Sequence, residues 1–198
     1  MLNIDGLVIG RQEKPIGNTH HHPLSFRLSA GHGLLLEGEN GSGKTTLLHT
    51  LAGICPVLSP ASFKVDVPCF LLSAEFSLKP YLTVWENISL QARLYGNDTH
   101  QAEALLKEAG LYPFVKRRSN QLSHGQKQRL ALACTKISQR TLWLLDEPEQ
   151  GLDSQGIELL KLWLQQHFSD GGMAVIASHH PHLYPDFSRL SIGNKKHD

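Results

Sequence analysis

The sequence lacks long hydrophobic runs: no window of its 198 residues approaches the roughly twenty consecutive apolar residues of a membrane-spanning helix. Its N-terminus also lacks the basic segment and apolar stretch of a secretion signal. Cysteine is scarce, and the three residues present, Cys55, Cys69 and Cys134, have no metal-ligand spacing. We therefore expect reduced thiols in a cytoplasmic protein without a membrane span of its own.

The chain also lacks an excess of charge of either sign. Its formal net charge is +1, which offers no electrostatic basis for a nucleic-acid partner. What remains is the composition of an ordinary globular protein, with 40% hydrophobic and 19% charged residues. The length suits one well-cored domain and is short for two, so we expect a single domain over residues 1–198.

Histidine is the residue type in excess, with twelve copies. His20, His21 and His22 form one cluster, and residues 179–182 contain a second. Adjacent histidines in a polar loop are usually solvated, and metal or haem ligation would need a second set of ligands, which the sequence does not offer. We therefore favour a solvated loop over a ligand site.

The most informative stretch follows an apolar run at residues 34–36 and reads Gly38-Glu39-Asn40-Gly41-Ser42-Gly43-Lys44-Thr45-Thr46. Glycines let backbone N–H groups converge on an anion, and the helix that begins here adds partial positive charge. Lys44 can reach terminal phosphates, and the Thr45 hydroxyl can ligate Mg²⁺. The stretch predicts nucleoside triphosphate binding, and a glycine turn without a ligand would not need this combination of residues.

Apolar spacing divides the chain into strands and helices. We expect strands at residues 2–9, 24–28, 34–36, 70–72, 141–145 and 173–177, and one further short strand within 56–68. We expect helices at residues 44–52, 83–95, 98–109, 123–137 and 154–167. Because the later strands show no polar alternation, a parallel sheet covered by helices on both faces is predicted.

Asp146 and Glu147 end one of these apolar strands. A buried strand that delivers acids to its carboxyl end supplies what a phosphate site needs opposite the glycine loop. Asp146 can hold Mg²⁺, and Glu147 can orient and deprotonate an attacking water molecule. Alone, the pair could be a solvated turn, but beside the glycine loop we favour the catalytic interpretation.

In this order, the motifs resemble those of ABC-type ATPases, the ATP-binding subunits of ATP-binding-cassette transporters. Leu122-Ser123-His124-Gly125-Gln126 is similar to the family's signature motif, Gly151-Leu152-Asp153 to its D-loop, and Ser178-His179 to its switch histidine. The resemblance implies an α/β P-loop fold with a mainly parallel core sheet, a small N-terminal antiparallel β part and a helical insertion at about residues 83–121. It also implies ATP hydrolysis with Mg²⁺.

The resemblance assigns roles to the later motifs. Ser123 and Gly125 would face the nucleotide held by another subunit, in a homodimer or a heterodimer of such ATPases. Asp153 would couple the two sites, and His179 would contact the γ-phosphate and fix the attacking water. Each residue also has a plainer interpretation: Ser123 with Gln126 forms a helix cap, and an isolated histidine is more often structural.

A narrower similarity points to the ATP-binding subunits of haem exporters for cytochrome c biogenesis. It is carried by residues 82–87, 141–148 and 178–181, and an end soon after His179 fits a subunit without an appended regulatory domain. It implies a peripheral position on the cytoplasmic face of the inner membrane. A membrane-spanning partner would then dock a coupling helix on the helical insertion and on residues 75–80.

The chain departs from the family pattern at several places. Glu75 stands where the family has a magnesium-contacting glutamine, and His124 replaces the middle glycine of the signature. No Phe, Tyr or Trp precedes Phe26, so the usual aromatic partner of the adenine is missing, with Arg11 or the first histidine cluster as substitutes. The short segment 44–75 implies a trimmed β part.

Two rival functions stay open at this point. One is a regulatory or scaffold ATPase that dimerises on ATP and does not serve transport. The other is a degenerate cassette that binds ATP without hydrolysing it, an interpretation that rests on Glu75 and His124. The presence of Glu147 and His179 argues against the second.

Overall fold

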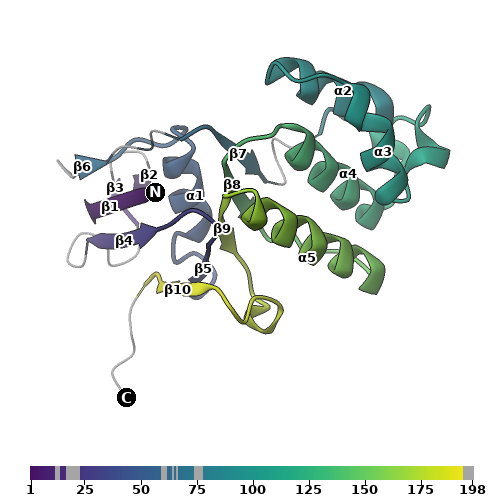
Figure 1. The fold of residues 1–198 in the computed structure, drawn as a ribbon. Helices are drawn as coiled ribbons and strands as arrows, with labels where there is room; N and C mark the ends of the chain where they lie inside the picture. Colours follow the sequence, from purple (N-terminus) through teal and green to yellow (C-terminus); the bar gives the residue numbers. More distant parts are fainter. Residues whose placement is uncertain are drawn as a thin grey trace. The chain divides into compact units, whose positions relative to one another are not determined.

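The computed structural model describes residues 1–11, 14–16, 23–58, 62–63, 65, 67–73 and 78–193. The chain divides into two compact units (Figure 1). The first unit consists of Met1–Leu71, Thr141–Glu147 and Phe168–Asp198, and the second of Leu72–Arg140 and Pro148–His167.

The first unit is built on a five-stranded sheet with the strand order β10-β5-β9-β8-β7. Its strands are β5 (Gly33–Glu37), β7 (Cys69–Leu72), β8 (Leu142–Asp146), β9 (Met173–Ala177) and β10 (Ser188–Ser191). The strands β10, β5, β9 and β8 run parallel. Every residue of the central strand β9 is buried, as expected of a strand covered on both faces. The predicted parallel sheet is confirmed.

The strand β10 was not expected from the sequence. It reads Ser-Arg-Leu-Ser, and its residues are mostly exposed. An edge strand of this kind carries neither an apolar run nor a clear alternation, so its pairing with β5 could not be predicted from its residues alone.

Helix α1 (Lys44–Leu51) follows β5 and contacts β8 and β9. Its side chains Leu47, Leu48 and Leu51 are buried in the core of this unit. The helix ends as predicted, because Gly53 takes the positive φ of 74° that follows a helix C-terminus.

The predicted small antiparallel part is a three-stranded sheet with the order β4-β1-β6. Strand β1 (Leu2–Leu7) pairs antiparallel with β4 (Leu24–Leu28) and with β6 (Ser62–Phe63), the short strand expected within residues 56–68. Alternation along β1 buries Leu2, Ile4 and Leu7. Two short strands, β2 (Gly10–Arg11) and β3 (Lys14–Pro15), form a separate ribbon.

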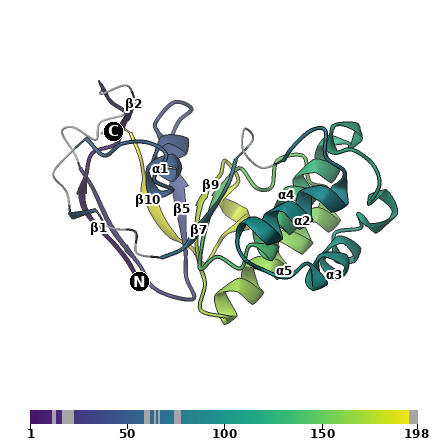
Figure 2. The ribbon, with the colours of Figure 1, turned by 90° about the horizontal axis from the view of Figure 1, so that it is seen from above.

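The second unit is helical (Figure 2). It contains α2 (Val84–Leu94), α3 (His100–Glu108), α4 (His124–Ile137) and most of α5 (Ser154–Ser169). Both capping boxes predicted from sequence are present, at Thr83 with Glu86 and at Ser123 with Gln126. The helical part is larger than the predicted insertion, since α4 and α5 belong to the same compact unit.

Asn87 on α2 fixes the chain just before this helix. Its side chain is 3% exposed, accepts a hydrogen bond from Lys79 N, and donates to the carbonyl oxygens of Lys79, Leu82 and Thr83. We expect Asn87→Ala to lower the free energy of unfolding by about 3 kcal/mol, because several buried backbone groups lose their partner. Denaturant unfolding would measure the loss, with Leu94→Ala on the exposed face of α2 as the control. A loss as small as that of the control would contradict this role.

Candidate functional site

The register of the parallel strands brings the predicted motifs of the first unit together. Leu36 of β5 and Asp146 of β8 are each paired with Ala177 at the end of β9. The glycine loop follows Leu36, His179 follows Ala177, and Asp146 is itself the first residue of the acid pair. The three motifs therefore lie at one edge of the sheet, where the carboxyl ends of parallel strands form a ligand-binding crevice.

The glycine loop adopts backbone conformations that only glycine takes readily. Gly38, Gly41 and Gly43 have φ angles of 154°, 79° and 109°. A Cβ atom at Gly38 would lie 2.4 Å from the carbonyl oxygen of Ile192, whereas the Cα of Gly41 faces open space. The loop leads to α1, whose N-terminus has no side-chain cap. An uncapped helix N-terminus after such a loop suits an anion.

Lys44 and Thr45 begin α1 and face the acids. The Lys44 ammonium donates to the carbonyl oxygens of Gly38 and Glu39 at 2.7 and 3.1 Å, which holds it over the loop. The Thr45 hydroxyl donates to Asp146 Oδ2 at 2.8 Å. Burial raises the pKa of Asp146, and the hydrogen bond from Thr45 opposes that rise. A hydroxyl and a partly buried carboxylate are the hard oxygen donors that Mg²⁺ prefers.

Glu147 lies at the end of β8 in a strained conformation. Its φ of 47° is in the left-handed region, which costs a non-glycine residue about 1–3 kcal/mol. Its backbone N–H donates to the Ala177 carbonyl at 2.9 Å, and its carboxylate lies 3.5 Å from His179 Nε2. Both side chains stay partly exposed, at 37% and 43%. Strain at a solvent-accessible carboxylate beside a histidine indicates a position kept for function rather than for stability.

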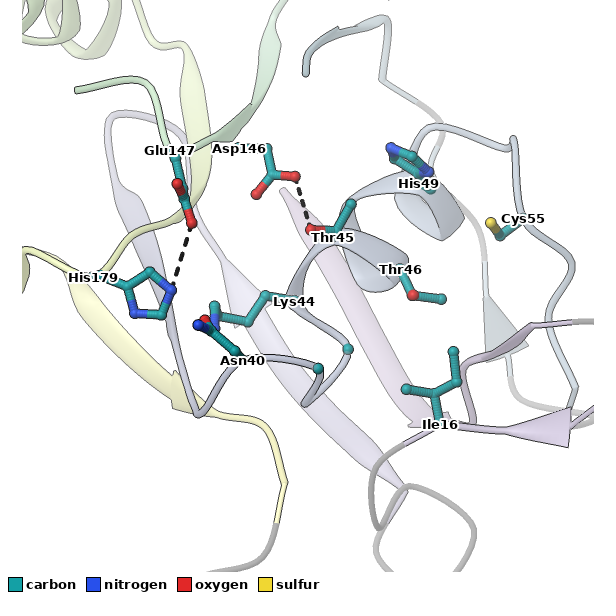
Figure 3. Close-up of a pocket in the computed structure, with 12 residues that line it drawn as sticks. Ile16, Asn40, Lys44, Thr45, Thr46, His49, Cys55, Asp146, Glu147 and His179 are labelled. Atoms are coloured by element: carbon teal, nitrogen blue, oxygen red, sulfur yellow. Dashed lines mark hydrogen bonds and ion pairs between the residues drawn. The ribbon is translucent and has the colours of Figure 1, made fainter. Parts of the chain in front are cut away.

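These groups line one cavity of about 370 Å³. Figure 3 shows Lys44 and Asn40 near Glu147 and His179 at one end of the cavity and Asp146 with Thr45 in the middle. The other end is lined by Thr46, His49, Cys55 and Ile16. The predicted residues that line it are Asn40, Gly41, Gly43, Lys44, Thr45, Thr46, Asp146, Glu147 and His179. Gly38, Glu39 and Ser42 belong to the same loop and support its shape.

The cavity also contains residues that sequence reasoning missed: Ile16, His49 and Cys55. His49 follows Thr45 by one helical turn, and this spacing would have placed it on the same face of α1. Ile16 lies in a segment whose residue spacing gives no signal of a site. The predicted substitutes for the missing aromatic partner of the adenine, the Arg11 side chain and residues 20–22, lie outside what the structure describes.

Ser123, Gly125 and Asp153 belong to the second unit. The Ser123 hydroxyl accepts from Gln126 N at 3.2 Å, so the plainer interpretation as a helix cap holds. Asp153 accepts from Gly156 N at 2.8 Å, as an N-terminal cap of α5, and pairs with Arg129. These bonds lower the pKa of Asp153. Glu75, the third predicted magnesium ligand, lies outside the described residues.

The donors in the first unit fit a magnesium nucleotide. A glycine cradle, an uncapped helix N-terminus and a lysine ammonium suit the charged phosphates, and Thr45 with Asp146 suits the metal ion. Within the part of the chain that the structure describes, no three His, Cys, Asp or Glu side chains form a metal site of their own. Nor does any described helix combine the length and apolar character needed to cross a membrane.

Comparison with known proteins agrees with this fit. Residues 21–150 match the sequence profile of the ABC transporter family. The chain is 39% identical over 170 residues to the cytochrome c biogenesis ATP-binding export protein CcmA of Paracoccus denitrificans, an alignment that covers 86% of this chain and 80% of that protein. The protein of the same name from Roseobacter denitrificans is 35% identical over 192 residues, which cover 97% and 90% of the two chains.

A solved structure of a dimeric bacterial ABC transporter cassette superposes with a TM-score of 0.81 at 22% identity. The superposition covers 98% of this chain and 94% of that one. Together with the strand order, it confirms the α/β fold class expected from the motifs.

Proposed function

The chain belongs to the ABC transporter family, and from this membership we propose that it binds and hydrolyses ATP to power a membrane-spanning partner. The observation that carries the proposal is the meeting of three motifs at one edge of the sheet. The register of β5, β9 and β8 brings the glycine loop, the acid pair and His179 to one cavity. We interpret residues 1–198 as one ABC ATPase domain with a helical insertion.

In the proposed mechanism, the glycine loop and Lys44 hold the phosphates, and the rigid helix N-terminus needs little reorganisation as charge develops. Thr45 and Asp146, with Glu75 as a third candidate, would hold Mg²⁺, which when bound neutralises charge on the phosphate oxygens. Glu147 accepts a proton from the attacking water. His179, 3.5 Å from that carboxylate, orients the water and the γ-phosphate.

The motifs of the second unit are proposed to act on a second nucleotide. Ser123 and Gly125 at the start of α4 would face the γ-phosphate bound by a partner ATPase, and Asp153 would report its state. The structurally similar cassette is a dimer, which supports a dimeric arrangement here. We propose that ATP closes this dimer and that hydrolysis reopens it.

The relatives named as cytochrome c biogenesis export proteins support the same role here, and we propose that the transporter exports haem. The protein would then lie on the cytoplasmic face of the inner membrane. Tyr81 and Trp85, just before and at the start of α2, are 76% and 40% exposed. Exposed aromatic side chains on the helical second unit could pack against an apolar coupling helix of the membrane-spanning partner.

We expect Tyr81→Glu/Trp85→Glu to lower recovery of the membrane-spanning partner from detergent extracts at least tenfold, because two new charges would face an apolar helix. ATP binding should stay unchanged, since neither residue lines the nucleotide cavity. Leu94→Glu, an exposed apolar position of the same helix, is the matched control and should retain the partner. Recovery of only soluble partners by the unmodified protein would favour the rival, a regulatory or scaffold ATPase.

A further inference from the structure

His124 is the unusual residue of the signature motif, and its ring lies against Gly151 of the D-loop. A Cβ atom at Gly151 would lie 2.0 Å from His124 Cδ2 and 2.8 Å from its Nε2. At such distances a side chain at Gly151 would have to displace the His124 ring from its present position. The glycine at 151 and the histidine at 124 are therefore matched in size.

The backbone makes a second contact between the same two motifs. A Cβ atom at Gly125 would lie 2.6 Å from the carbonyl oxygen of Gly151. The first turn of α4 thus approaches the D-loop backbone as closely as only glycine permits. This contact also requires glycine at 125, independently of any nucleotide.

A third link runs through side chains. Arg129, one turn further along α4, forms an ion pair with Asp153 at the start of α5. The same Asp153 carboxylate oxygen caps α5 through Gly156 N at 2.8 Å. The Arg129 side chain is 19% exposed and the Asp153 side chain 62% exposed, so the ion pair lies at the surface and serves to orient the two segments more than to stabilise them.

From these three contacts we propose that His124 and Gly151 are positioning residues. Their size-matched contact, together with the Arg129–Asp153 pair, joins the signature motif and the D-loop into one rigid surface. This inference rests on the proposed function, in which the surface contacts the nucleotide bound by a partner ATPase. The histidine ring is held against Gly151 of the D-loop.

The proposal predicts that the effect of Gly151→Ala depends on residue 124. The new methyl group would displace the His124 ring, and because the ring ends a flexible side chain, the protein should still fold. We expect Gly151→Ala to lower kcat for ATP at least tenfold in the otherwise unmodified chain. The same substitution in a His124→Gly background should lower kcat less than threefold, because the ring is gone.

The backbone strain of alanine at the φ of 74° is common to both backgrounds, so it cancels in the comparison. All four chains are to be assayed with their membrane partner, with KM for ATP and the thermal midpoint measured in parallel. KM should change less than threefold, since the glycine loop and Lys44, which we propose hold the nucleotide, are unaltered in all four chains. A loss in thermal stability alone, with kcat intact, would mean a merely structural contact and would overturn the proposal.

Equal losses of kcat in the two backgrounds would also overturn it while leaving ATP hydrolysis as the function. If the unmodified complex did not turn over ATP at all, both this inference and the proposed function would fail. The two failures are therefore distinguishable by the unmodified complex alone.

Discussion

Glu147→Gln is expected to reduce ATP turnover by about 10²–10⁴-fold while ATP binding persists. The substitution keeps the shape of the side chain and the backbone at φ 47°, so the strained turn after β8 should form as before. What is lost is the carboxylate that we propose accepts the proton of the attacking water. Among the described residues, Asp146 is the other carboxylate that lines the cavity, and its Oδ2 atom already accepts the Thr45 hydroxyl.

Phosphate release from the purified complex would measure turnover, and equilibrium binding of an ATP analogue would measure affinity. Asp170→Asn, which removes an exposed acid from a turn of the same unit, is the matched control and should leave both values unchanged. Unchanged turnover in Glu147→Gln would contradict the assignment of the base. Loss of binding together with turnover would mean that Glu147 shapes the cavity instead.

The parts of the site that the sequence predicts well are those coded by local motifs. The glycine loop needs its positive φ angles, and acids after a buried strand point to a site once that loop is present, so Gly41, Lys44 and Asp146 could be predicted to lie together. The parallel sheet followed from strands that lack polar alternation. In both cases backbone geometry or burial restricts the residue types, and such restricted patterns can be recognised in a single sequence.

Other features depend on contacts between distant segments and could not be predicted. The edge strand β10 is specified by its pairing with β5, and its own residues are mostly polar. Ile16 enters the cavity from a segment whose spacing gives no signal. The direction of the His124 ring depends on a side-chain rotamer and on the absence of a side chain at Gly151, which lies far along the chain.

Lys44→Met is expected to weaken ATP binding roughly 100-fold, equivalent to about 2.7 kcal/mol. Methionine is one atom shorter but keeps an unbranched apolar stem in place of a residue that is only 7% exposed, so the core of the first unit should remain packed. The lost ammonium is the cation that the carbonyl oxygens of Gly38 and Glu39 hold over the glycine loop, where we propose that the phosphates bind. Charge-assisted hydrogen bonds to phosphate oxygens in such a site are among the strong ones.

Stabilisation by ATP offers a direct measurement, because a ligand that binds only the folded state raises its stability by an amount set by its concentration and affinity. At an ATP concentration of 100 times the dissociation constant, the unmodified chain should gain about 2.7 kcal/mol, and Lys44→Met about 0.4 kcal/mol at the same concentration. Arg27→Ala, which removes an exposed cation from β4, should keep the full gain. If Lys44→Met kept it as well, the phosphates would have to be held by the loop backbone and the dipole of α1 alone, and the lysine would serve only to brace the loop.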